Sequence, residues 1–309
     1  MKTDYWVCVI TKNGADFIGQ TLASIFDQTS PPAFVVVVDD GSTDATPTIL
    51  EDFSSRLRKG TSPRVPLDVI NLPDNGYDIR RVPANLNAAY AYVEEIGKTF
   101  EYSMVSGDDC AYPSDYCAVL LSEMDDDHLV VASGDCETPP RLSDSKAPQG
   151  SGRFVRNSFW QTLGGRYPVR YGWESWLLFK AMQAGHRILN LSELRYHHLR
   201  PSGSVHKFTH WGLEMRALGY HPLVVLKRFV DEALGRGAGS ISLQGSLSMT
   251  MAYFLARLHD EDPYYVPFDE QLRSFVRNLQ LDRLLNQLPS EFRPIASAFW
   301  TITGRLANP

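Results

Sequence analysis

Two pairs of neighbouring aspartates are the residues of this chain whose types and spacing best suit chemistry. Asp39 and Asp40 come directly after four consecutive valines at 35–38. Asp108 and Asp109 follow a second apolar stretch at 102–105. A β-branched run bounded by turn formers indicates a central strand that is covered on both faces. Because ligands of open α/β sheets bind at the carboxyl ends of the strands, we expect both pairs at one crevice.

Four carboxylates in one crevice repel one another unless a cation lies between them. The usual solution is a hard divalent cation that one or two carboxylates hold together with substrate phosphates. The residues alone leave other roles open, since Asp109 also suits a cap for the helix that follows and Asp108 suits an ion pair with an arginine. The sequence therefore predicts Mn²⁺ or Mg²⁺ bound with a diphosphate.

The elements that position these acids alternate through the first half of the chain. Asp44 suits an N-cap, and Pro47 suits the first turn of the helix that follows. We expect strands at 5–11, 34–39, 67–71, 101–106 and 128–134, and helices at 15–28, 44–58, 83–97 and 114–124. This order predicts an α/β fold with a doubly wound, mostly parallel sheet flanked by helices.

The second half of the chain changes character near residue 205. A proline-rich loop is expected at 137–152, helices at 157–163 and 173–184, and a short strand at 186–189. Beyond 205 only helices are expected, at 206–218, 222–234, 241–258, 267–287 and 290–303. We therefore predict a binding and catalytic domain over 1–205 and a helical C-terminal region over 206–309.

The composition excludes several classes of protein. With 309 residues, 43% hydrophobic and 21% charged, the chain is globular, and its net charge of −6 argues against a nucleic-acid binder. The four cysteines form no Cys-x-x-Cys pair, which favours free thiols over a disulfide or zinc framework. Neither a signal peptide nor an apolar run of about 18–20 residues is seen, so we expect a cytoplasmic protein or one at the inner face of a membrane.

Several motifs, taken in order, resemble those of the family 2 glycosyltransferases, which have the GT-A fold. The stretches TKNG at 11–14 and TLASIFDQT at 21–29 are similar to the family's first strand and helix. VDDGSTD at 38–44 resembles its nucleotide-binding stretch, and SGDD at 106–109 stands where the family has D-A-D-D. GG at 164–165 and GWES at 172–175 stand in place of its "G-G…G-x-E-D" pattern. The resemblance covers about residues 5–205.

The resemblance implies a hexosyltransferase that uses a nucleotide-diphosphate sugar, a UDP-sugar as the first expectation, with inversion and a divalent metal. It implies that Asp39 or Asp40 contacts the base and ribose, and that Asp108 coordinates the metal that bridges the diphosphate. Asp109 would support that metal or face the sugar. Three further residues of the matching motifs are expected to bind the nucleotide: Thr11, Asn13 and Asn85.

The chain departs from the family pattern at two of these motifs. Ser106 replaces the first acid of the D-A-D-D motif, which leaves Asp108 as the main metal ligand. The family's A-R-N reads P-A-N at 83–85, so its arginine is missing. We expect Arg81, or its neighbour Arg80, to reach the same phosphate, because a guanidinium suits bidentate contact with phosphate.

The catalytic base and a second metal ligand are expected in the last part of the matching region. An inverting transfer needs a base on the acceptor hydroxyl. The family's E-D pair is Glu174-Ser175 here, so Glu174 takes the role of the base by default, with helix capping as the alternative.

The stretch 196–204 resembles the family's C-terminal H-x-x-x-S region, where a histidine joins the metal. We favour His198 over His197 as that ligand, because a neutral imidazole suits Mn²⁺, and we expect His197 and Ser204 as supporting residues. Solvated loop histidines are the alternative. The three histidines expected to be structural are His128, His186 and His221.

Other functions and partners stay open at this point. A nucleotidyltransferase also places acids around a metal and a diphosphate, and a degenerate binding module without transfer activity would fit the serines at 106 and 175. The apolar stripes of the helical region suit a core, a homodimer face or a groove for a glycan or lipid-linked acceptor. Its basic side chains suit peripheral contact with an anionic membrane.

Overall fold

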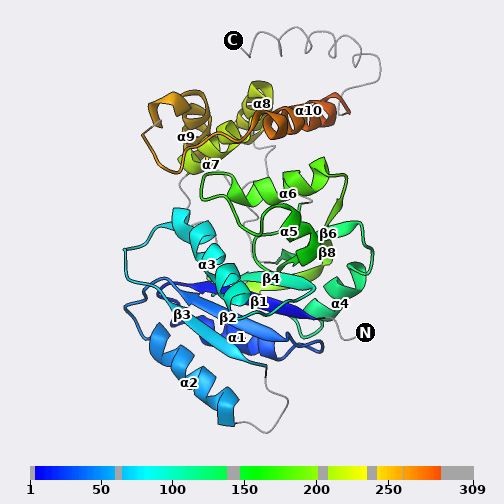
Figure 1. The fold of residues 1–309 in the computed structure, drawn as a ribbon. Helices are drawn as coiled ribbons and strands as arrows, with labels where there is room; N and C mark the ends of the chain where they lie inside the picture. Colours follow the sequence, from blue (N-terminus) through cyan, green and yellow to red (C-terminus); the bar gives the residue numbers. More distant parts are fainter. Residues whose placement is uncertain are drawn as a thin grey trace. The chain divides into compact units, whose positions relative to one another are not determined.

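The computed structural model describes residues 4–59, 65–137, 147–200, 208–234, 242–259 and 261–286. The chain separates into two compact units, residues 1–206 and residues 207–309. The first unit is a mixed α/β sandwich and the second is helical (Figure 1).

A mixed sheet forms the middle of the first unit. Its strand order is β3-β2-β1-β4-β7-β6-β8-β5. Strands β1 to β4 pair in parallel, β7 is antiparallel to both β4 and β6, β8 is parallel to β6, and β5 is antiparallel to β8. The strands are β1 (Tyr5–Thr11), β2 (Phe34–Asp39), β3 (Leu67–Asn71), β4 (Tyr102–Gly107), β5 (Cys110–Ala111), β6 (Leu129–Cys136), β7 (Arg153–Arg156) and β8 (Arg187–His198).

The register of the parallel strands places both aspartate pairs at one edge of the sheet. Thr11, the last residue of β1, pairs with Asp39 at the end of β2. On its other side, β1 pairs Ile10 with Gly107 at the end of β4. The segments that follow β1, β2 and β4 therefore begin level with one another, as the sequence led us to expect.

Helices cover both faces of this sheet. Alternate β1 residues Tyr5, Val7 and Val9 pack in a core with α1, α2 and α4. On the opposite face Trp6 packs edge-on against Tyr90 of α3, and Figure 1 shows α2 and α3 on opposite sides of the sheet. The helices of this unit are α1 (Ile18–Phe26), α2 (Thr46–Lys59), α3 (Val82–Glu95), α4 (Tyr116–Glu123), α5 (Asn157–Thr162) and α6 (Trp173–Gln183), with a 3₁₀ turn η1 (Ile79–Arg81) before α3.

The structure confirms the expected α/β class and corrects three details of the elements. Strands β5 and β7 were not predicted, and β8 runs on to residue 198, whereas a strand was expected only at 186–189. Residues 138–146 of the loop expected at 137–152, and the helix expected at 290–303, lie outside the described residues.

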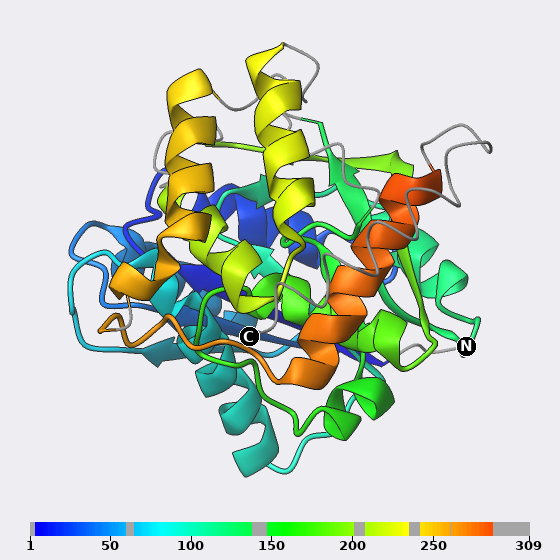
Figure 2. The ribbon, with the colours of Figure 1, turned by 90° about the horizontal axis from the view of Figure 1, so that it is seen from above.

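The second unit packs its helices around a small apolar core. Met215, Val225, Met249 and Tyr253 form this core, and a Cβ on Gly212 would lie 2.1 Å from the Met249 carbonyl oxygen, so α7 and α9 approach closely. Figure 2 shows α8 and α9 side by side. Within the described ranges no helix is long and apolar enough to cross a membrane. The elements are α7 (Phe208–Ala217), α8 (Pro222–Ala233), α9 (Leu243–Phe254), η2 (Ala256–His259) and α10 (Glu270–Asn286).

Candidate functional site

The turn after β2 is shaped by Asp39 and Asn13. The buried Asp39 carboxylate accepts a hydrogen bond from the Ser42 amide (2.8 Å), and the Ser42 hydroxyl accepts one from the Asn13 amide (2.8 Å). The Asn13 side-chain oxygen accepts from the Thr43 amide at 2.8 Å, and Asn13 itself has a positive φ of 52°. Both residues were expected to contact a nucleotide, and in this structure their side chains hold the turn that would face it.

Asp44 ends this turn in the manner expected of a cap. Its carboxylate accepts hydrogen bonds from the Thr46 amide at 2.9 Å and from the Ala15 amide at 3.1 Å. Burial, the largest single effect, raises the pKa of the Asp44 carboxyl, but the hydrogen bonds from Thr46 and Ala15 together outweigh it, so the pKa is lowered. The start of α2 is thereby tied to the segment that follows β1.

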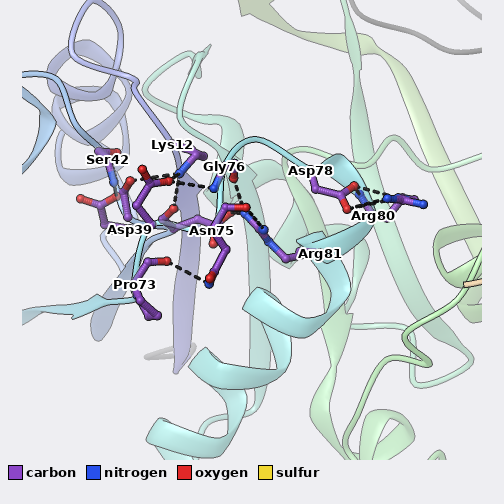
Figure 3. A network of polar contacts seen from close by, with 12 residues as sticks. Lys12, Asp39, Ser42, Pro73, Asn75, Gly76, Asp78, Arg80 and Arg81 are labelled. Atoms are coloured by element: carbon purple, nitrogen blue, oxygen red, sulfur yellow. Dashed lines mark hydrogen bonds and ion pairs between the residues drawn. The ribbon is translucent and has the colours of Figure 1, made fainter. Parts of the chain in front are cut away.

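Asp40 is paired with Arg81, and Figure 3 shows Arg81 beside Asn75 and Gly76. The Arg81 Nη2 atom lies 2.8 Å from Oδ2 of the buried Asp40, and the same guanidinium donates to the carbonyl oxygens of Asn75 (2.9 Å) and Gly76 (2.5 Å). Arg80, the alternative considered from the sequence, instead forms a two-point contact with Asp78, in which Nε donates to Oδ1 and Nη2 donates to Oδ2, each at 2.9 Å. The structure therefore brings Arg81, and not Arg80, to the acids after β2.

Lys12 belongs to the same network and was missed by the sequence interpretation. Its ammonium donates to the carbonyl oxygens of Asp40 (2.6 Å) and Gly41 (3.0 Å) and to the Asp74 carboxylate (2.8 Å). The one local signal was its position directly after the first strand. These contacts fasten the turn after β2 to the loop after β3 (Figure 3).

Asn85 does not join this network. It is buried in the first turns of α3, and it makes no hydrogen bond or ion pair with Asp39, Asp40 or Asp108 within the described chain. Its expected role at the nucleotide stays a prediction.

The acid pair after β4, Asp108 and Asp109, is buried against the end of β1. The Thr11 hydroxyl donates to Asp108 Oδ2 at 2.7 Å, and the Thr21 hydroxyl donates to the Asp108 carbonyl oxygen at 2.6 Å. Burial raises the pKa of the Asp108 carboxyl; the Thr11 hydrogen bond opposes the rise, and the charge of Asp109 adds to it. A nearby cation would stabilise the charged form of a buried carboxylate that lies beside a second carboxylate.

Ser106, which stands where the family pattern has an acid, is turned into the protein interior. Its hydroxyl donates to the Gly107 carbonyl oxygen at 2.7 Å and shares a 2.8 Å hydrogen bond with the Tyr112 hydroxyl. Of this motif, the two aspartates that follow are therefore the residues that offer carboxylates, and their binding of a metal stays a prediction.

His198 reaches the acid pair because β5 pairs with β8. The pairing sets Cys110 opposite His198, and His198 Nδ1 lies 3.5 Å from Asp109 Oδ2. One ligand atom each of Asp109, Cys110 and His198 lies within 4.8 Å of the others. The sequence grouped His198 with Asp108, and in this structure Asp109 is the acid that meets it.

The donor atoms of this cluster fit a divalent cation. Carboxylate oxygens with one imidazole nitrogen suit Mn²⁺, while Mg²⁺ prefers oxygen ligands. Burial raises the pKa of the Cys110 thiol well above its ordinary value, and a sulfur ligand suits softer metals than Mn²⁺. Asp109 and His198 are therefore the ligands that this cluster offers a metal, and Asp108, which the cluster does not include, stays a predicted ligand.

His197 lies away from the acid pair. Its Nδ1 is 3.2 Å from a Glu137 carboxylate oxygen, and 66% of its side chain is exposed. Successive residues of a strand point to opposite faces, so His197 and His198 cannot both face the site. Ser204, the other expected supporting residue, lies outside the described residues.

Glu174, the expected base, lies in the first turn of α6. Its Oε1 is 2.8 Å from Nη2 of Arg153 on β7, and the preceding Gly172 has a φ of 84° that suits glycine. Arg153 also donates to the carbonyl oxygens of Gln149 (2.7 Å) and Pro148 (3.2 Å). The glutamate thus holds segment 148–153 through the arginine and makes no contact with the aspartates in the described residues.

Comparisons with known proteins agree with this architecture. A family model described as Glycosyl transferase family 2 matches residues 6–183. No curated protein sequence matches the chain.

Solved structures share the fold at low sequence identity. The structure of S. aureus TarS 1–349 in complex with UDP-GlcNAc has 17% identity and a TM-score of 0.52, over 96% of this chain and 86% of that one. The mannosyltransferase PcManGT from Pyrobaculum calidifontis, in complex with GDP-Man and Mn²⁺, has 18% identity and a TM-score of 0.53, over 98% and 80%. GalNAc-T7 with UDP, GalNAc and Mn²⁺ has 15% identity and a TM-score of 0.52, over 85% and 58%.

Proposed function

This chain belongs to glycosyl transferase family 2, and from that premise we propose that it transfers a hexosyl group, with inversion, from a nucleoside-diphosphate sugar to an acceptor hydroxyl. The observation that carries the proposal is the convergence of the Asp40–Arg81 pair and the Asp108–Asp109 pair at the carboxyl ends of three parallel strands. The first pair offers an acceptor and a donor for a nucleobase and ribose, and the second offers ligands for a cation on the diphosphate.

We assign Mn²⁺ as the cofactor, with Mg²⁺ as the alternative. Asp108, Asp109 and His198 would hold it, and when bound it would neutralise negative charge on the departing diphosphate. Two of the similar structures are described with Mn²⁺, which supports this choice. Thr11 would keep Asp108 oriented through its hydrogen bond.

UDP is the first expectation for the nucleotide and GDP the second. Similar structures carry UDP-GlcNAc and GDP-Man. We propose that Asp40 meets the base and that Arg81, which the sequence placed at a phosphate, instead holds Asp40 there; Asp39 and Asn13 support the site through the turn that they shape.

We propose Glu174 as the base. Its carboxylate would take the proton of the acceptor hydroxyl while the new glycosidic bond forms and the bond between the anomeric carbon and the diphosphate oxygen breaks. Its position in the first turn of a helix and its 44% exposed side chain support access to an acceptor. Arg153 would orient it, since the ion pair fixes one carboxylate oxygen.

The acceptor is proposed to be a glycan or a lipid-linked glycan, met in the cytoplasm or at the inner face of a membrane. The support is the row of exposed apolar side chains on α8 and α9, which includes Leu226, Val230, Leu247 and Met251. Flotation with vesicles that contain anionic lipid tests the membrane contact. Sedimentation that shows a dimer, without vesicle binding, would instead assign these side chains to a homodimer.

Calorimetry with UDP, GDP and dTDP, with and without Mn²⁺, tests the donor class. We expect one of them to bind tightly and only with the metal. Hydrolysis or transfer from the matching sugar nucleotide then separates the enzyme from a degenerate binding module, which would bind without turnover. Incorporation of label from a nucleoside triphosphate would favour a nucleotidyltransferase instead.

A further inference from the structure

Arg200, two residues beyond His198, lies against both carboxylates of the acid pair. Its Nη2 atom is 3.6 Å from Asp108 Oδ1, and its Nε atom is 3.7 Å from Asp109 Oδ2. The amide of Leu199 donates to the Asp109 carbonyl oxygen at 2.7 Å, which fixes the chain just before the arginine. One guanidinium therefore bridges the two acids expected to bind the metal.

This contact is an ion pair without a hydrogen bond. Both distances exceed the roughly 2.7–2.9 Å of a charge-assisted N–H···O bond. The guanidinium also lies over the Phe17 ring, 5.2 Å from its centroid, and 35% of the Arg200 side chain is exposed. Charge and stacking hold the arginine here, so it can leave the acids without breaking a hydrogen bond to them.

A divalent cation and the guanidinium compete for the same oxygens. A metal bound to Asp108 and Asp109 would repel a positive group that lies 3.6–3.7 Å from those carboxylates. A diphosphate, in contrast, accepts bidentate hydrogen bonds from a guanidinium. The guanidinium that neutralises the acid pair is thus also well suited to bind the diphosphate of the donor.

Resting on the function proposed above, we propose that Arg200 is a resident counter-ion of the acid pair that turns to the donor's diphosphate when metal and nucleotide bind. Before the donor binds, Arg200 competes with the metal for the two carboxylates. In the loaded protein it binds phosphate oxygens, with Phe17 as the surface on which it turns.

Two binding measurements on the full chain test this proposal. Mn²⁺ alone is titrated and followed by the electron paramagnetic resonance signal of the free ion, and UDP and GDP are then titrated at saturating Mn²⁺. For Arg200→Ala we expect Mn²⁺ to bind several-fold more tightly and the nucleotide about tenfold more weakly, which is roughly one charge-assisted contact. The proposal thus predicts that one substitution changes the affinities for Mn²⁺ and for the nucleotide in opposite directions.

Two further variants separate charge from geometry. Arg200→Lys keeps the positive charge but lacks the paired N–H donors of the guanidinium. This variant should therefore bind Mn²⁺ as the wild type does and the nucleotide more weakly. His197→Ala, on the neighbouring but outward-facing position of β8, should change neither affinity. If Arg200→Ala does not fold, the lysine variant decides alone: unchanged nucleotide affinity overturns the proposal.

Other results also overturn it. Weaker or unchanged Mn²⁺ binding by Arg200→Ala would show that the arginine does not compete with the metal. Unchanged nucleotide binding would show that it does not receive the diphosphate. If the wild type binds Mn²⁺ but neither UDP nor GDP, the proposed donor class fails, and the Mn²⁺ titration still decides whether Arg200 is the resident counter-ion.

Discussion

Arg153 of β7 and Glu174 of α6 form an ion pair of 2.8 Å in which the arginine is 3% exposed and the glutamate 44% exposed. The same guanidinium donates hydrogen bonds to the carbonyl oxygens of Pro148 and Gln149. The glutamate therefore has a structural role in holding segment 148–153, in addition to its proposed role as the base. The two roles can be separated by mutation.

Glu174→Gln should abolish transfer and spare donor binding. The amide oxygen still accepts a hydrogen bond from Arg153, while the neutral side chain can no longer take a proton. Loss of a general base lowers the rate by about 10²–10⁴-fold. Single-turnover transfer and calorimetry with the nucleotide measure the two effects, and normal turnover would reassign the base.

The companion variant Glu174→Ala probes the structural role. It leaves the buried Arg153 without its carboxylate, at a cost of about 1–3 kcal/mol. Its melting temperature should therefore fall below that of Glu174→Gln. Equal melting temperatures for the two variants would mean that the ion pair contributes nothing to the stability of this segment.

Asp108→Asn should weaken nucleotide binding and raise the melting temperature of the protein. Burial raises the pKa of this carboxyl, so the ionised form is held at a cost that the neutral amide does not bear. We expect metal-dependent nucleotide binding to weaken by about a hundredfold or more, and the melting temperature to rise. Retained affinity for the nucleotide with Mn²⁺ would remove Asp108 from the metal site.

Gly14→Ala should damage the acid pair through space alone. A Cβ at residue 14 would lie 2.2 Å from Asp108 Oδ2 and 2.6 Å from the Thr11 hydroxyl oxygen, so the carboxylate must move. Mn²⁺ affinity should drop about tenfold or more, because metal ligands tolerate little displacement. Titration of Mn²⁺ measures it.

Gly19→Ala is the matched control for this substitution. Gly19 lies in α1, and an added Cβ would meet nothing closer than Ile49 Cγ2 at 3.9 Å. Alanine there should leave Mn²⁺ binding unchanged and stabilise the helix by about 0.5–1 kcal/mol. A similar loss of Mn²⁺ affinity in both variants would point to a general disturbance of α1.

Much of the sheet could be predicted because its first strands are local patterns. The strands at 5–11, 34–39 and 67–71 were predicted with their observed bounds, since apolar and β-branched runs end at clear turn formers. Strand β7 was missed because its first and last residues are Arg153 and Arg156, which are buried. Their charges are met by Glu174 and by the Met124 carbonyl oxygen, and no local pattern reveals such distant partners.

The candidate site divides in the same way. Asp39, Asp40, Asp108 and Asp109 were recognised because each pair directly follows a strand, which fixes its place in an α/β sheet. Lys12 and Arg200 lie in the stretches 11–14 and 196–204 that resemble the family, but they were given no role, because their roles depend on contacts with other loops.

Arg81→Lys should weaken nucleotide binding, and Arg80→Lys should not. A lysine at 81 cannot contact Asp40 and the carbonyl oxygens of Asn75 and Gly76 together as the guanidinium does. We expect affinity for UDP or GDP to fall about tenfold. Arg80 contacts Asp78 instead, so equal losses in both variants would contradict the assignment of Arg81 to the site.

His221→Asn should remove a pH dependence from the stability of the helical unit. The buried His221 caps α8, since its Nδ1 accepts a hydrogen bond from the Leu223 amide, and burial, with a smaller effect of Arg277, lowers the pKa of the imidazole. The unfolded chain takes up the proton first as the pH falls, so the stabilisation is complete above the unfolded pKa of about 6.5 and is lost below it. Asparagine is a good N-cap that does not titrate.

Melting temperatures at about pH 7.5 and 5.5 should therefore differ less in His221→Asn than in the wild type, while the exposed-site control His128→Asn should keep the wild-type difference. An unchanged pH dependence in His221→Asn would show that other groups set it.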